Sequence, residues 1–132
     1  MKVIGIDPGL AATGVGIVWG HGMDVEGYAF GSIATPQSDP LARRLERIYT
    51  KLHAILQRET PDQMIVEDVF SLEKYPQSGI TLGKVTGVVL LAAVIAAMGG
   101  ILSEVGAVTG APFDADTLRT YLGHAPSAFL EK

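Results

Sequence analysis

Two apolar runs in this chain each end on a carboxylate. Residues 2–6 (KVIGI) are followed by Asp7, and residues 63–66 (QMIV) are followed by Glu67. Short apolar runs bounded by turn residues are typical of buried strands. The sequence therefore predicts two buried strands, each with an acid at its carboxyl end.

Two further strands are predicted between these runs. Residues 14–19 (GVGIVW) follow a turn that contains Pro8 and Gly9, and they read as a hairpin partner of the first strand. Residues 25–33 alternate small or apolar positions with larger or polar ones, as a strand with two different faces does. Together with residues 2–6, these segments predict a three-stranded antiparallel meander.

A helix is predicted after the meander. Ser38 or Asp39 is the expected N-cap, and Pro40 is expected at the first helical position. Apolar residues then follow at alternating spacings of four and three, which is the pattern of one buried helix face. The residues of this stripe are Leu41, Leu45, Ile48, Leu52 and Ile55.

The second half of the chain predicts a helix over residues 81–98, a strand over residues 104–109 and a short helix over residues 114–122. The uncharged stretch 85–102 is at the lower length limit for a membrane span. Gly99-Gly100 interrupts it, and no aromatic belt flanks it, so we expect a buried helix and no membrane partner.

The order strand, helix, strand favours a parallel pairing of the two strands that end on acids. Their carboxyl ends then meet at one edge of the sheet, which brings Asp7 and Glu67 together. Two neighbouring carboxylates repel unless a cation lies between them, and hard oxygen ligands suit Mg²⁺ or Mn²⁺. The alternative is that Asp7 caps its own turn and Glu67 only ends a strand.

Composition narrows the function classes. The chain has 132 residues, which fits one domain, and it has no cysteine, which excludes disulfides and thiolate chemistry. Its formal charge of -4 argues against binding nucleic acid through bulk electrostatics, so any polyanion must meet a local basic patch. The first residues lack the features of a secretory signal peptide, and we expect a cytoplasmic protein.

Three stretches carry a family resemblance. "GIDPGLAATG", "IVEDVF" and "GITLGKVTGVVLLAA" resemble, in order and spacing, the RuvC family of Holliday-junction resolvases over about the first 98 residues. The resemblance implies an α/β fold of the ribonuclease-H-like class, with a mixed sheet, an antiparallel meander, parallel strands and flanking helices. It also implies a dimeric endonuclease that cuts four-way DNA junctions in recombination and repair, alongside a junction helicase. Asp7 and Glu67 match the family's catalytic ligands for two Mg²⁺ or Mn²⁺ ions.

Other residues gain a possible role from the resemblance. Phe70 matches an aromatic residue that enters the junction centre, although a core position is the alternative. Lys74, Lys84 and Arg119 are candidates for phosphate contacts, and the alternative for each is an ordinary solvated side chain. Gly83 and Gly87, four residues apart on the apolar helix, indicate close approach either of a second copy or of the chain's own sheet.

The resemblance weakens after about residue 100. The family's final helix carries further acids, and no matching pattern follows Glu67 here. Asp114 and Asp116 are the late acids that can substitute, and a helix N-cap is the alternative for them. We therefore expect one domain over residues 1–132 that is truncated or divergent near its end. Its cleavage activity is in doubt, and a non-catalytic module that binds branched DNA or only dimerises is the alternative.

Overall fold

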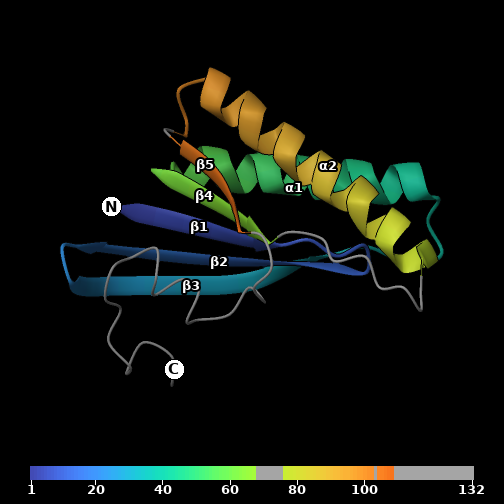
Figure 1. Cartoon of the computed structure of the whole chain (residues 1–132), viewed down its shortest axis with the longest axis horizontal. Helices are drawn as coiled ribbons and strands as arrows, with labels where there is room; N and C mark the ends of the chain where they lie inside the picture. Colours follow the sequence, from blue (N-terminus) through green and yellow to red (C-terminus); the bar gives the residue numbers. More distant parts are fainter. Residues whose placement is uncertain (68–75, 103, 109–132) are drawn as a thin grey trace.

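The computed structural model describes residues 1–67, 76–102 and 104–108. The strands in this part of the chain form one five-stranded sheet in the order β3-β2-β1-β4-β5 (Figure 1). Strands β1, β2 and β3 form an antiparallel meander, whereas β1, β4 and β5 run parallel. The strands are β1 (Lys2–Asp7), β2 (Ala12–His21), β3 (Asp24–Ala34), β4 (Gln63–Glu67) and β5 (Glu104–Val108). The predicted mixed α/β sheet is confirmed.

Two helices, α1 (Leu41–Glu59) and α2 (Pro76–Met98), cover the same face of the sheet (Figure 1). Of the stripe predicted for the first helix, Ile48 and Leu52 are fully buried, whereas Leu41 is exposed. Leu56, which the prediction left out, is fully buried as well. The three buried residues pack against apolar side chains of the sheet and of α2 in one core. Its other members on the strands and on α2 are Ile4, Ile6, Val15, Ile17, Ile33, Met64, Val66, Val85, Val89, Ala92, Ala93 and Ala96.

Two predicted helix starts are wrong. The N-cap of α1 is Pro40 and makes no side-chain cap hydrogen bond, so neither Ser38 nor Asp39 is the cap. Helix α2 begins at Pro76, five residues before the predicted start at Thr81. Proline is favoured in the first turn because its missing N–H is not needed there. The polar residues that follow Pro76 hid this turn from an argument based on apolar periodicity.

The start of β1 is tied to the far end of α1. Lys2 Nζ donates to the Glu59 carbonyl oxygen at 2.9 Å and lies 3.5 Å from its carboxylate. The hydrogen bond from Arg58 holds the pKa of Glu59 below its usual value, and Lys2 acts in the same direction. Asp62 also accepts the Lys2 backbone N–H at 2.7 Å. The amino end of β1 is therefore anchored to the end of α1 and to the loop that leads into β4.

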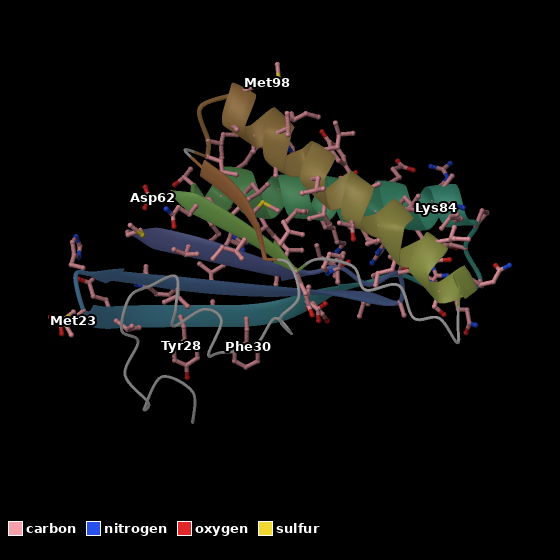
Figure 2. The ribbon with its side chains drawn as sticks, in the orientation of Figure 1. Met23, Tyr28, Phe30, Asp62, Lys84 and Met98 are labelled. Atoms are coloured by element: carbon pink, nitrogen blue, oxygen red, sulfur yellow. The ribbon has the colours of Figure 1, made fainter. Side chains whose placement is uncertain are left out.

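The sheet has two different faces because side chains alternate along each strand. Ile4 and Ile6 point to the helices, so Val3, Gly5 and Asp7 lie on the opposite face. Tyr28 and Phe30 also point away from the helices (Figure 2), and their rings stack with centroids 6.4 Å apart. Phe30 is 78% exposed.

One helix in the described part of the chain, α2, is long and apolar enough to cross a membrane by length and composition alone. In this fold it lies against α1 and the sheet (Figure 1). Only one side of the helix is buried, and a row of apolar side chains faces away from the core. The row consists of Ile80, Leu90, Leu91, Val94, Ile95 and Met98. The predicted buried helix is therefore only partly covered within the single chain.

Candidate metal centre

Asp7 and Glu67 are the last residues of β1 and β4, which are neighbouring parallel strands. The register pairs Gly5 with Ile65 and Ile6 with Val66, so one further step places Asp7 beside Glu67. Both residues fall on the face opposite the helices, by the alternation that sends Ile6 and Val66 into the core. Neighbouring strands lie about 4.8 Å apart, which is close enough for one cation to contact both carboxylates.

Gly14 keeps the space beside Asp7 open. It pairs with Asp7 across the β1–β2 ladder, and a Cβ at this position would lie 3.3 Å from the Asp7 Cβ. At Gly16, the next small residue on this face, no atom of the described residues lies within 4 Å of the position of a Cβ. A larger side chain at Gly14 would therefore crowd the Asp7 side chain.

The loop after Asp7 is a tight, hydrogen-bonded turn. Thr13 is fully buried, and its hydroxyl donates to the Gly9 carbonyl at 2.8 Å. A Cβ on Gly9 would lie 2.3 Å from the Ala12 carbonyl oxygen, so this position requires glycine. The "DPGLAAT" sequence therefore builds a compact loop that begins at the Asp7 carboxylate.

The structure locates some of the other predicted site residues. Lys84 is exposed on α2, in the helical layer (Figure 2). Phe70, Lys74, Asp114, Asp116 and Arg119 lie outside the described residues, as does the predicted helix over residues 114–122. Among the described residues, no group of three or more His, Asp or Glu side chains is placed to hold a metal ion. The carboxylate pair is therefore the candidate centre.

Sequence reasoning missed two features of this centre. Gly14 was assigned only to a strand, although a glycine opposite a strand-terminal acid signals an open position. Thr35, which contacts the loop after Asp7, gave no signal because its partners Leu10 and Ala11 lie far away in the chain.

We expect Gly14→Val to block the centre without disturbing the sheet. Valine favours strands, but its side chain would stand against Asp7, where even a Cβ is only 3.3 Å away. The expected result is an affinity for Mn²⁺ lowered about tenfold, in the range of changes to the surroundings of metal ligands. Isothermal titration calorimetry measures it. Gly16→Val, on the same face with open space, is the matched control; an equal loss in both variants would contradict the assignment.

Comparisons with known proteins bear on the family and the fold of this chain. The family model described as "Crossover junction endodeoxyribonuclease RuvC" matches residues 3–104. A curated relative of that name from Carboxydothermus hydrogenoformans is 36% identical over 133 residues, covering 99% of this chain and 77% of the relative. Another, from Azorhizobium caulinodans, is 38% identical over 92 residues, covering 70% of this chain and 54% of the relative.

Solved structures show the same fold. "T. thermophilus RuvC in complex with Holliday junction substrate" superposes with a TM-score of 0.71 at 26% identity, covering 98% of this chain and 74% of that chain. "Thermus thermophilus RuvC structure" gives 0.69 at 25% identity, covering 99% and 88%. The match spans little more than half of several curated relatives. The family model nevertheless covers most of the chain, and the chain belongs to the RuvC family of crossover junction endodeoxyribonucleases.

Proposed function

We propose that this chain binds four-way DNA junctions and hydrolyses their phosphodiester bonds with a divalent cation held by Asp7 and Glu67. The observation that carries the proposal is the position of these two acids, one register step beyond Ile6 and Val66 on neighbouring parallel strands. The names of the relatives, and the junction complex of the Thermus protein, support the choice of substrate.

The residues of the centre fit Mg²⁺ or Mn²⁺. Mg²⁺ is held by one or two carboxylates and completes its shell with water and substrate phosphate. When bound, such an ion activates a water molecule and stabilises the charge on the leaving oxygen. Asp7 and Glu67 anchor the ion from one face of the sheet, and Gly14 leaves the space in which phosphate approaches.

We expect slow cleavage by this chain. Two carboxylates anchor one ion, whereas the two-ion mechanism that the family resemblance implies needs further ligands. Asp114 and Asp116 are proposed as substitutes. Mn²⁺ should support more cleavage than Mg²⁺, because Mg²⁺ demands near-ideal octahedral geometry.

The remaining DNA contacts are proposals of the same kind. Lys74, Lys84 and Arg119 are proposed to bind phosphates, and Phe70 to enter the junction centre. A cytoplasmic location and a junction-helicase partner are proposed on the strength of the family resemblance.

We propose that the exposed side of α2 binds a second copy of the chain. Gly83 and Gly87 lie on this side, and no atom of the described residues lies within 4 Å of the position of a Cβ, so they do not pack on the described strands of the sheet. Small residues let a partner's backbone approach closely, and the adjoining Leu91 and Val94 supply apolar area. A two-fold dimer also matches a substrate in which two strands are cut at symmetric positions.

The test compares a labelled four-way junction with a linear duplex of the same sequence. We expect preferential binding to the junction, and paired cleavage products in Mn²⁺ that exceed those in Mg²⁺. Junction binding with no cleavage in either metal would support the non-catalytic module. Equal binding to junction and duplex would refute both forms of the proposal.

A further inference from the structure

The loop between Asp7 and β2 is held by a residue from a distant part of the chain. The Thr35 hydroxyl donates to the Leu10 carbonyl, and the Thr35 backbone N–H donates to the Ala11 carbonyl at 3.0 Å. With the bond from Thr13 to Gly9, three consecutive carbonyls of this loop each accept a hydrogen bond. Backbone groups paired in this way leave the loop little conformational freedom.

The Thr35 hydroxyl also connects the loop to α1. Thr35 is only 7% exposed, and Arg44 Nε donates to its hydroxyl oxygen at 2.8 Å. The hydroxyl therefore donates to the loop and accepts from a cation at the same time. A charged donor shortens and strengthens a hydrogen bond, and it polarises the hydroxyl toward its own acceptor.

The two other arginines at the start of α1, Arg43 and Arg47, have different hydrogen-bond partners from Arg44. Arg43 is exposed and pairs with Glu46 at 2.9 Å, one turn along the same helix. Arg47 Nε donates to the Ala34 carbonyl at 3.0 Å, at the end of β3. Of these three residues, Arg44 is the one that contacts the hydroxyl bonded to the loop after Asp7.

We propose that Thr35 and Arg44 are positioning residues for Asp7. Asp7 is the last residue of β1 and passes directly into this loop through Pro8, so the loop's orientation sets the direction from which the carboxylate meets Glu67. Metal ligands must be held within about 0.5 Å of their working geometry by the residues that support them. The inference rests on the proposed function, because it assigns Asp7 to a metal centre.

The test uses whole-chain variants that break the chain of hydrogen bonds from Arg44 through the Thr35 hydroxyl to the loop, which we call the relay. Thr35→Val keeps the volume of the side chain and loses the hydroxyl, whereas Thr35→Ser keeps the hydroxyl. Arg44→Gln and Arg44→Lys both lose the Nε donor, but the lysine keeps the charge. Arg43→Gln is the matched control, because it removes an exposed cation from the same turn that does not contact Thr35.

Two measurements are made on each variant: the exchange rates of backbone amide hydrogens without metal, and the affinity for Mn²⁺ by electron paramagnetic resonance. We expect Thr35→Val and both Arg44 variants to weaken Mn²⁺ binding about tenfold, the lower end of effects for residues that support metal ligands. We expect Thr35→Ser and Arg43→Gln to bind Mn²⁺ like the wild type. The amides of residues 9 and 35 should exchange about tenfold faster when the relay is broken.

Each alternative has its own result. If Arg44 acts only by binding a phosphate, both Arg44 variants keep wild-type Mn²⁺ affinity and wild-type exchange at residues 9 and 35, because neither measurement contains phosphate, and this result overturns the proposal. If the residues only stabilise the fold, amides in the centre of β1, such as that of Ile4, exchange faster by the same factor as those of residues 9 and 35. That result overturns it as well.

The proposed function and this inference can fail separately. If the wild-type chain does not bind Mn²⁺, the proposed metal centre is refuted. Faster amide exchange confined to residues 9 and 35 in Thr35→Val and Arg44→Gln would still show that these two residues hold the loop. Unchanged exchange in Thr35→Val and Arg44→Gln refutes that hold even if wild-type Mn²⁺ binding and junction cleavage are both observed.

Discussion

Replacing Asp7 with Asn is expected to abolish measurable Mn²⁺ binding and any metal-supported cleavage of a four-way junction. The asparagine is nearly the same size and keeps one oxygen, but it removes the negative charge that attracts the cation. Changes to groups that only support a metal ligand cost about 10- to 100-fold in affinity, so loss of a ligand's charge should cost at least 100-fold. Glu67→Gln should behave in the same way. Titration calorimetry with Mn²⁺ and a cleavage assay measure the two effects.

Asp24→Asn is the matched control for this prediction. Asp24 is an exposed aspartate at the hairpin between β2 and β3, at the opposite end of β2 from Gly14 and therefore far from the candidate centre. Its variant should bind Mn²⁺ and junction DNA as the wild type does. If Asp7→Asn also keeps wild-type Mn²⁺ affinity, Asp7 is not a ligand, and its charge serves the turn that follows it.

Leu91→Glu is expected to convert a dimer of this chain into monomers. Leu91 is 54% exposed on the outer side of α2. It belongs to the exposed apolar row that ends at Met98, at the end of this helix (Figure 2). A carboxylate buried in such an interface without a partner must be desolvated, which costs several kcal/mol. We expect the dissociation constant to rise at least 100-fold, or about 2.7 kcal/mol. Sedimentation velocity across a concentration series measures it.

Met23→Glu is the control for the dimer. Met23 is also an exposed apolar residue, but it lies at the hairpin between β2 and β3, at the far side of the sheet from α2 (Figure 2). That variant should remain dimeric. A wild-type chain that is monomeric at micromolar concentration would count against the second copy. Partition into lipid vesicles, lost in Leu91→Glu, would instead assign the exposed side of α2 to a membrane.

The pairing of Asp7 with Glu67 followed from local patterns and one topological rule. Two apolar runs ended on acids with a helix between them, and a right-handed crossover makes such strands parallel. The observed register, with Ile6 beside Val66, confirms the parallel pairing from which the carboxylate centre was inferred. The parallel pairing was predictable because crossover handedness and chain direction depend little on the details of packing.

The orientation of α2 was not predictable in the same way. Its residues are apolar around most of the circumference, so periodicity does not tell the core side from the outer side. Packing against α1 and the sheet selected Val85, Val89 and Ala92 for the core. Leu91 and Val94, which are equally apolar, were left outside.

The sequence by itself determined the strand and helix order, the antiparallel meander, the parallel pair and the two acids at its carboxyl ends. These features arise from periodicity, turn residues and chain direction, which are local properties. Only the tertiary structure decided that Gly14 opens the space beside Asp7 and that Thr35 and Arg44 hold the loop after it. Thr35 lies 25 residues from Leu10 in the chain, and the two meet only because β3 ends beside the start of β2. Hydrogen bonds across such separations depend on how the strands and α1 pack, and no local pattern of residues specifies them.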